Sequence, residues 1–275
     1  MATLSHDLLI VAILGYLFAM MCYAAEYAFG ARGAIARVAH AQTPVLVGAG
    51  GPPEIDVPGL RPVDDVPPSA PDRLGRYAPT AGRVAVILTA VGLLAHVACL
   101  VARGLAAHRV PWGNMYEFII AVTLVCSIGW MILVLRRPAV RPLGLIVTLV
   151  LVVLLGIDLI VLRTAVEPLV PALNSYWLKI HVTLAITASG TFMVGFCAAA
   201  LYLVRAGYEK RVAAEQPVGF PYTLGPRLPV ATSLERLAFR IHAFAFPIWT
   251  LAIMCGAIWA EAAWGRYWGW DPKET

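Results

Sequence analysis

The run Leu143-Gly-Leu-Ile-Val-Thr-Leu-Val-Leu-Val-Val-Leu-Leu-Gly-Ile-Asp-Leu-Ile-Val-Leu-Arg163 decides the fold of this chain. It contains a single acidic residue, Asp158, and its basic residue stands at the very end. An α-helix rises about 1.5 Å per residue, so about 20 such residues cross the roughly 30 Å hydrocarbon core of a bilayer. The run therefore predicts a membrane-spanning helix.

Five further stretches have the same character, at about 8–30, 83–102, 115–135, 177–205 and 234–262. The 275-residue chain is 60% hydrophobic and only 13% charged, whereas soluble domains carry about 25% charged residues. We therefore predict an all-α fold, a polytopic integral membrane helix bundle with about six transmembrane helices.

The first stretch and the segment after it have separate roles in this prediction. No basic residue precedes the first stretch, so residues 1–30 are predicted to be a retained anchor helix rather than a cleaved signal peptide. Residues 31–82 contain nine prolines and seven glycines, and they are predicted to form a cytoplasmic linker. Residues 83–275 form the remaining transmembrane domain.

Basic residues predict the orientation of the helices. Fifteen of the twenty-one Lys and Arg residues fall in 31–83, 136–142 and 205–240. The positive-inside rule then places these loops in the cytoplasm and the N-terminus outside. With six spans, the C-terminal segment also lies outside. The net charge of +5 is thus explained by topology, so we expect the lipid bilayer as a partner and no nucleic acid.

A tryptophan-rich segment, Trp264-Gly-Arg-Tyr-Trp-Gly-Trp-Asp-Pro-Lys-Glu-Thr275, directly follows the last apolar stretch. Its glycines and proline interrupt a helix, although Trp264 and Trp268 have the i, i+4 spacing that stacks side chains on a helical turn. Flat aromatic faces on a loop suit a flat apolar ligand such as a porphyrin. The alternative is an aromatic belt at the membrane interface.

Two acidic residues in this segment, Asp271 and Glu274, cannot bind the anionic propionates of a porphyrin. We expect them to orient Trp indole N–H groups or a histidine ligand.

His181 is predicted to lie about one turn inside the fifth helix, at the end that also holds the tryptophan-rich segment. An imidazole there can serve as an axial ligand of haem iron, or it can be a hydrogen-bonded structural residue. His96 lies within the second helix and has the same two interpretations, since ionisable residues at membrane depth are functional candidates. His108 is expected to be solvated and His242 to be structural.

Three segments carry a resemblance to a known family. The tryptophan-rich segment resembles the W-G-x-x-W-x-W-D-x-x-E signature of haem-handling membrane proteins of cytochrome c maturation. Pro111–Glu117 is similar to their P-x-x-N-x-Y-E loop, and Leu173–Val182 to their L-x-S-x-W-L-x-x-H-V segment. More narrowly, the chain resembles the CcsA/ResC-type subunit (CcsB/CcsA) of the system II cytochrome c synthase over about residues 83–275. The signature is matched by Trp264, Gly265, Trp268, Trp270, Asp271 and Glu274.

The resemblance implies a function. The family carries or presents haem b at the outer face of the bacterial cytoplasmic (inner) membrane for covalent attachment to the C-x-x-C-H segment of apocytochrome c. A ResB-type membrane subunit and thiol-reducing proteins are the implied partners, in a complex of the haem lyase type. The rival hypothesis is a transporter of haem, or of another amphipathic substrate, without attachment activity.

The resemblance also assigns residues. It makes His181 an external axial ligand of the haem iron and the signature residues contacts of the haem, whereas His96 is a candidate ligand on membrane depth alone. Asn114 and Glu117 would line the same vestibule, although capping of the third helix explains both. From their side of the membrane and their charge alone, Arg103, Arg109 or Arg266 could pair with propionates.

Full-length members of the family continue past the signature into helices with two further haem-ligand histidines. The resemblance therefore implies a truncated chain that is inactive by itself.

Smaller structural expectations complete the sequence-based prediction. The five cysteines lie in apolar stretches without a C-x-x-C pair and are expected to be small buried side chains. Thr232-Ser-Leu-Glu235 has the pattern of a capping box at the start of the last helix. Pro247 should kink that helix. Asp158 is costly at membrane depth and is expected to pair with an arginine.

Overall fold

The computed structural model describes residues 1–29, 73–166 and 175–269, and every regular element in these ranges is helical. Three short elements accompany the long helices: the 3-10 helices η2 (Pro138–Leu143) and η5 (Tyr222–Arg227), and the π-helical turn η3 (Asp158–Leu162). The long helices are α1 (Ala2–Phe29), α3 (Arg73–Ala107), α4 (Met115–Arg136), α5 (Gly144–Ile157), α6 (Tyr176–Ala213) and α7 (Ala231–Trp264).

Six helical segments of the described chain are long and apolar enough to cross a membrane. η2, α5 and η3 follow one another directly and count as one of them, Pro138–Leu162. The prediction of an all-α, polytopic membrane bundle with about six spans is therefore confirmed. Which end of the bundle lies outside stays a prediction.

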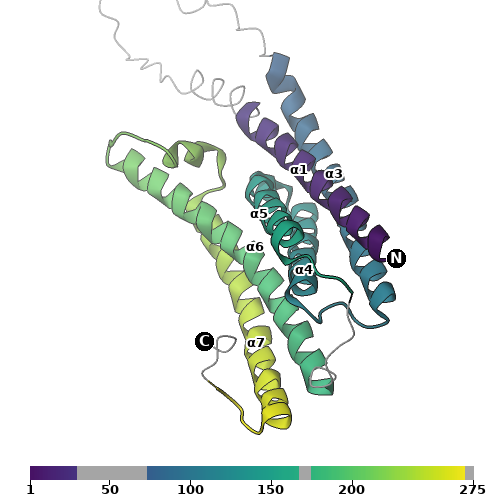
Figure 1. The fold of residues 1–275 in the computed structure, drawn as a ribbon. Coiled ribbons are helices and arrows are strands. Elements are labelled where there is room, and N and C mark those ends of the chain that lie inside the picture. Colours follow the sequence, from purple (N-terminus) through teal and green to yellow (C-terminus); the bar gives the residue numbers. More distant parts are fainter. Residues whose placement is uncertain (30–72, 167–174, 270–275) are drawn as a thin grey trace, which may run out of the picture.

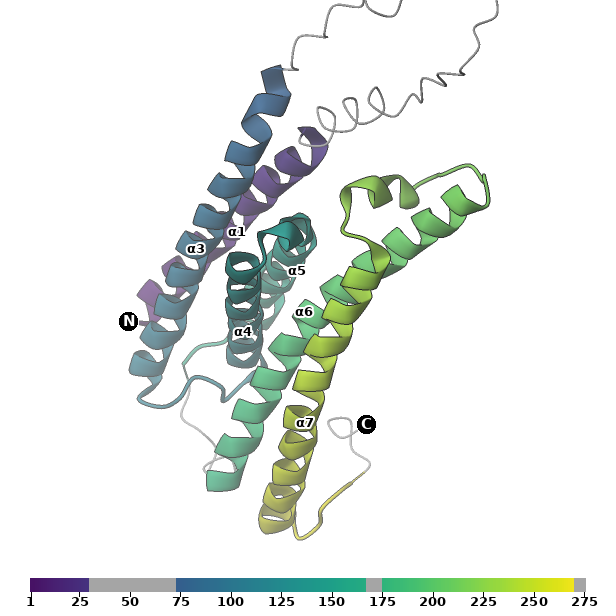
Figure 2. The same cartoon turned by 180° about the vertical axis from the view of Figure 1, so that it is seen from behind.

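The helices form two long pairs with a shorter layer between them. α1 packs along α3, and α6 packs along α7. α4 and α5 lie between these two pairs, where they contact each other and both neighbours (Figure 1 and, from behind, Figure 2). Helices that follow one another in the chain run in opposite directions (Figure 1).

The first helix contributes to the core of the bundle. Tyr16 and Tyr23 of α1 are buried, and the Tyr23 ring meets Trp130 of α4 edge-on at 6.2 Å between centroids. Gly15 faces Gly92 of α3 so closely that a Cβ on Gly15 would lie 2.9 Å from the Gly92 Cα atom. Small residues of this kind let membrane helices approach each other. The helix predicted as an N-terminal anchor thus packs into the described bundle.

The predicted linker ends earlier than expected. α3 begins at Arg73, so residues 73–82 are helical, and Pro79 is accommodated inside that helix. Residues 31–72 of the predicted linker lie outside the described residues.

The predicted capping box at the start of α7 is wrong. The helix begins at Ala231 with Val230 as its N-cap and has no side-chain cap from its own first residues. Instead the Glu209 carboxylate of α6 accepts a hydrogen bond from the Ala231 amide at 3.3 Å, and Arg205 holds that carboxylate at 2.6 Å. A neighbouring helix therefore supplies the acceptor that the first turn needs. α7 then continues through Pro247, and the predicted kink stays a prediction.

The predicted arginine partner of Asp158 is also wrong. Asp158 is buried in η3, and neither carboxylate oxygen has a hydrogen-bond partner in the described structure. Arg103, the nearby cation, donates its Nε–H to Glu117 instead, at 3.1 Å.

Candidate functional site

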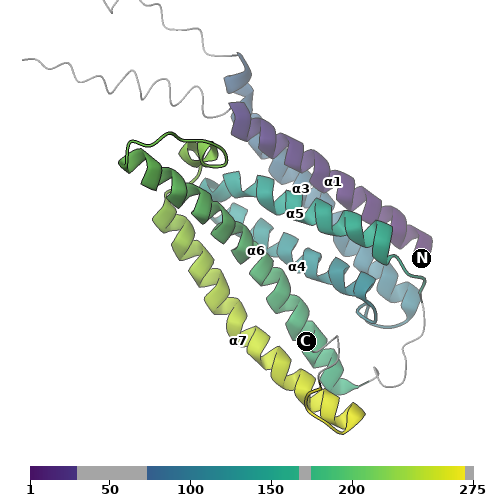
Figure 3. The same cartoon turned by 60° about the vertical axis from the view of Figure 1, so that its left-hand side comes forward.

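One end of the bundle gathers the candidate residues. α3 ends there, α4 and α6 begin there, and α7 ends there at Trp264 (Figure 3). We call this the tryptophan end. His181 lies in the second turn of α6, so the imidazole and the tryptophan-rich segment lie toward the same end, as predicted.

The His181 ring has one nitrogen engaged and one available. Its Nδ1 atom lies 2.7 Å from the Ala252 carbonyl oxygen of α7. Because a carbonyl only accepts, the proton is assigned to Nδ1, which leaves the lone pair on Nε2. The side chain is half-buried, and Nε2 has no hydrogen-bond partner among the described residues. A neutral imidazole whose Nδ1–H is fixed by a carbonyl is the usual state of a metal-ligating histidine.

A glycine makes this contact possible. A Cβ on Gly256 of α7 would lie 2.7 Å from His181 Nδ1, so the ring packs directly against the helix backbone. A similar close contact between a glycine and a histidine ring occurs further along α6 and α7, where a Cβ on Gly195 of α6 would lie 2.7 Å from the His242 ring. His242 donates to the Ala238 carbonyl of its own helix at 2.7 Å, which agrees with its predicted structural role.

The tryptophan-rich segment begins with a reversal of the chain. Gly265 ends α7 in the left-handed conformation, at φ 70°, which glycine adopts without strain. Ala252 precedes Trp264 by twelve residues, a helical rise of about 18 Å, so α7 projects well beyond His181. The described chain after Gly265 turns back alongside α7 (yellow in Figure 1). Residues 266–269 therefore turn back from the end of α7 instead of extending the helix.

Large indole surfaces are exposed here. Trp264 and Trp268 keep 45% and 52% of their surface exposed. Trp264 meets Trp259 edge-on, with 4.7 Å between ring centroids. The helix stops at Trp264, so Trp264 and Trp268 do not share a helical turn, and the expected i, i+4 stacking on such a turn is wrong. The remaining signature residues, Trp270, Asp271 and Glu274, lie outside the described residues.

Asn114 and Glu117 build the loop that joins α3 to α4. The Asn114 side chain accepts the Glu117 amide at 2.8 Å and caps α4, as predicted. The Glu117 carboxylate is fully buried, and it accepts the Gly113 amide at 2.8 Å and Arg109 Nη1 at 2.7 Å. The Glu117 carboxylate thus accepts hydrogen bonds from three residues: Arg103, Arg109 and Gly113. Both residues thus have a complete structural role.

The arginines suggested as propionate partners are occupied by the protein. Arg103 is buried, and besides Glu117 it donates to the carbonyls of Thr164 and Ala165. Arg109 is held by both carboxylate oxygens of Glu117. Arg266 lies against Gly269 so closely that a Cβ there would meet its guanidinium. The geometry therefore favours a structural role for Arg103 and Arg109.

His96 is enclosed. It is fully buried, its Nε2 lies 3.0 Å from the Ile120 carbonyl, and its Nδ1 lies 3.2 Å from the Tyr16 hydroxyl. The same hydroxyl lies 2.8 Å from Ser127 Oγ. With Nε2–H donated to the carbonyl, Nδ1 accepts from Tyr16. Both nitrogens are used, so the geometry favours the structural interpretation of this histidine.

Comparison with known proteins identifies the family. The profile described as "Cytochrome C assembly protein" matches residues 112–275. The chain belongs to this family. The match begins in the α3–α4 loop and runs through α7, so this family profile covers His181 and the tryptophan-rich segment but neither α1 nor α3.

Individual relatives agree with this family and support the CcsA-type resemblance. The chain is 40% identical to "Cytochrome c biogenesis protein CcsA" of Guillardia theta over 116 residues, 39% of this chain and 38% of that protein. It is 27% identical to the Cyanophora paradoxa protein of that name over 210 residues, 64% of this chain and 65% of that protein. For the Gloeobacter violaceus protein the identity is 28% over 237 residues, 68% of each. The chain thus matches less than two thirds of the first two relatives.

Sequence reasoning missed the partners of the histidines. Ala252 contributes only a backbone carbonyl, which no side-chain pattern reveals. Gly256 lies in the ordinary apolar run Met254-Cys-Gly-Ala-Ile258 and could have been noticed only as a small residue in a spanning helix.

Proposed function

We propose that this chain acts in cytochrome c biogenesis, holding haem at the tryptophan end of the bundle and presenting it to apocytochrome c. The family membership and the names of the relatives support the biogenesis role. The geometry of His181 and the exposed indoles supports haem as the molecule held. In this proposal the haem is substrate-like and of the b type, and the tryptophan end faces the outside of the membrane.

The availability of His181 Nε2 is the observation that carries the proposal. The Ala252 carbonyl fixes the protonated nitrogen, and the backbone at Gly256 fixes the ring plane. The remaining lone pair then stands ready for a metal without any further rearrangement of the side chain. Imidazole is a common axial ligand of haem iron, so the donor fits the group.

The exposed indoles fit the porphyrin. Trp264 and Trp268 offer flat apolar faces at the same end, and aromatic pairs contribute about 0.5–1.5 kcal/mol beyond burial of area. We include Trp270 as a further aromatic contact, and Asp271 and Glu274 as acceptors that orient indole N–H groups or an iron-ligating imidazole. Gly265 contributes the chain reversal that brings this segment back from the end of α7.

Asn114 and Glu117 enter the proposal through the loop that they hold. Their contacts fix residues 108–114 at the tryptophan end, and a fixed loop keeps the wall of the haem vestibule in place. Satisfied buried polar groups of this kind rigidify their surroundings. His96 is left out of the iron site because both of its nitrogens have protein partners.

Haem supplies the vinyl groups that accept the thiols of the C-x-x-C-H segment. The chain's own contribution is to hold and orient that haem, since a fixed reactant converts an encounter into an effectively intramolecular reaction. In this proposal the chain works with a ResB-type membrane subunit, and separate thiol-reducing proteins keep the apocytochrome cysteines reduced.

Purification of the protein from haem-replete cells tests the proposal. We expect b-type haem to copurify and give a Soret band. His181→Ala should lower the haem content at least tenfold, and His181→Gly should regain the band when imidazole is added. His242→Ala is the matched control, because its ring packs on the same helix pair but lies away from the tryptophan end. A Soret band that is unchanged in His181→Ala would overturn the proposed ligand.

A transporter of haem without attachment activity remains the alternative function. Cells that carry the protein with its partners should form holocytochrome c in the proposed role. Haem that appears outside the cytoplasm while holocytochrome c fails to form would favour transport instead.

A further inference from the structure

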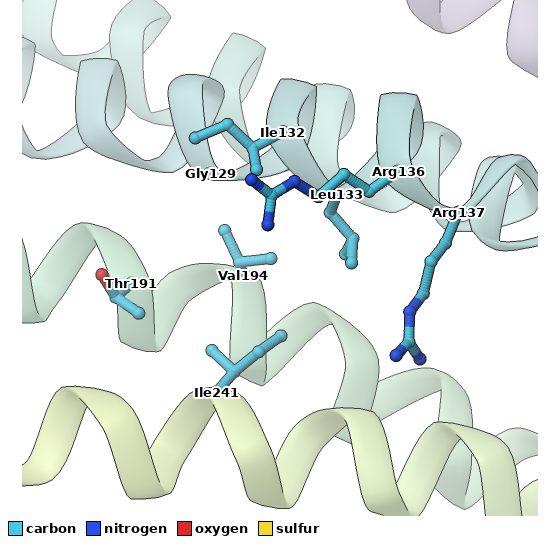
Figure 4. A pocket seen from close by; sticks show the side chains of 8 residues that line it. All are labelled: Gly129, Ile132, Leu133, Arg136, Arg137, Thr191, Val194 and Ile241. Atoms are coloured by element: carbon cyan, nitrogen blue, oxygen red, sulfur yellow. The ribbon is translucent and has the colours of Figure 1, made fainter.

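A cavity of about 350 Å³ opens between α4, α6 and α7, away from the tryptophan end. Gly129, Ile132 and Leu133 of α4 face Val194 of α6 and Ile241 of α7 across it (Figure 4). α4 and α6 approach each other at Gly129, where a Cβ would already lie 3.4 Å from Val194 Cγ2. Apart from Thr191 and two arginines, the residues that line this cavity are aliphatic or glycine.

Two cations, Arg136 and Arg137, also line this cavity. Arg136 is the last residue of α4, and Arg137 follows it as the C-cap. Figure 4 shows both guanidinium groups turned toward the space between α4 and the α6–α7 pair. Neither side chain has a hydrogen bond or ion pair within the described ranges 1–29, 73–166 and 175–269. The spanning segment Met115–Arg136 ends here, so these charges lie at the depth of lipid headgroups.

The cavity communicates with the surroundings of the bundle. Ile132 keeps 51% of its surface exposed although it lines the cavity, and both arginines are exposed. In a membrane these surroundings are lipid. An occupant can therefore enter sideways from the bilayer without passing through the core.

We propose that this cavity binds an anionic phospholipid, with an acyl chain against the aliphatic wall and the phosphate between Arg136 and Arg137. The chemistry of the lining matches such a molecule from end to end. Guanidinium groups bind phosphate oxygens through paired N–H donors, and basic pockets between spanning helices recognise anionic headgroups. Aliphatic walls favour an acyl chain through dispersion and burial.

Haem fits this lining less well. None of the residues that line the cavity is aromatic, so no ring is available to stack on a porphyrin face. The lining also has no histidine, cysteine, methionine or tyrosine to ligate iron. The two guanidinium groups alone would suit propionates, so haem is titrated as a competing ligand.

The experiment uses the full chain in a neutral detergent. Dioleoyl phosphatidylglycerol is titrated against dioleoyl phosphatidylcholine, and native mass spectrometry counts the lipid bound after mild activation. We expect selective retention of phosphatidylglycerol. The double variant Arg136→Gln/Arg137→Gln should lose affinity by roughly thirtyfold, as two headgroup contacts are removed. Ile241→Trp, which fills the cavity and keeps both charges, should lose the lipid as well.

The matched control is Arg236→Gln/Arg240→Gln. It removes two exposed arginines from the neighbouring part of α7, outside the cavity lining. We expect it to bind phosphatidylglycerol like the native chain. Equal loss in this control would show a general surface charge effect and overturn the proposal. So would unchanged binding in the Arg136→Gln/Arg137→Gln variant, or a Soret shift on haem addition that depends on these two arginines while phosphatidylglycerol binding does not.

Discussion

His96 and His181 both lie in apolar spanning helices, yet the structure surrounds them differently. His96 stands among α1, α3 and α4, fully buried, with a protein partner on each ring nitrogen. His181 stands in the α6–α7 pair, half-buried, with one nitrogen held by a carbonyl. Membrane depth therefore does not by itself mark a histidine as a candidate ligand, because His96 has no ring nitrogen left for a metal.

The same contrast extends to the polar groups around them. On the α3–α4 side, Glu117 is enclosed by donors from Arg103, Arg109 and the backbone. On the α6–α7 side, the exposed indoles of Trp264 and Trp268 leave surface for a ligand. The first region stabilises the bundle, and the second contains the proposed haem site.

The largest expected effect is a loss of stability on substitution of Glu117, the carboxylate enclosed by Arg103 and Arg109. Glu117→Ala leaves two buried guanidinium groups without their anion, and removal of one partner from a buried ion pair costs about 3–5 kcal/mol. The free energy of unfolding, measured by SDS titration in mixed micelles, should fall by that amount. Glu235→Ala, on the exposed side of the first turns of α7, is the control and should change it little. If the free energy of unfolding falls only slightly in Glu117→Ala, the ion pairs of Glu117 do not stabilise the bundle as expected.

His96→Leu should destabilise the protein by about 2 kcal/mol, because it removes the two buried hydrogen bonds that His96 makes with the Ile120 carbonyl and the Tyr16 hydroxyl. The haem absorbance per folded molecule should stay unchanged. A double-mutant cycle with Tyr16→Phe measures the coupling, expected at about 0.6 kcal/mol for a hydrogen bond within a membrane bundle. A shifted haem spectrum in His96→Leu would place this histidine in the iron site and contradict its structural assignment.

Gly256→Ala tests whether the close packing of the His181 ring against α7 supports haem binding. The new methyl group displaces the His181 ring from its carbonyl, and loss of such support lowers metal affinity by roughly tenfold or more. The haem dissociation constant and the Soret maximum should both change. Gly195→Ala crowds the His242 ring in the same way, so it should affect stability but leave haem binding alone. Equal haem loss in the two variants would indicate a general disturbance of the α6–α7 pair.

Trp268→Ala has the smallest expected effect. Removal of one aromatic contact should weaken haem binding by about 0.5–1.5 kcal/mol, a factor of roughly two to twelve. Phe239→Ala, an exposed aromatic residue near the other end of α7, should leave haem binding unchanged. Identical haem affinities in the two variants would remove the exposed indole from the site.

Much of the fold follows from composition alone. Six long apolar runs separated by polar or proline-containing segments leave a helix as the way to satisfy the backbone in a bilayer. The predicted spans therefore agree with the helices to within a turn or two at most ends, as at Met115–Arg136, predicted as 115–135. The cap at Asn114 was equally readable, since it depends only on residues three apart.

Predictions that needed a partner from elsewhere in the chain failed. The cap of α7 comes from Glu209 on a neighbouring helix, and the expected arginine of Asp158 is taken by Glu117. Spacing along one helix contains no information about either contact, because both depend on how helices lie against each other.

By itself, then, the amino-acid sequence determined that this protein is a helical membrane bundle of the cytochrome c assembly family with an aromatic segment after its last described span. Only the tertiary structure decided that His181, unlike His96, keeps a ring nitrogen without a protein partner among the described residues, since that depends on the Ala252 carbonyl and on the space at Gly256. The physical reason is that apolar content is a local property of the chain. Whether a histidine ring finds a hydrogen-bond partner depends instead on how two helices pack, as α6 and α7 do at His181.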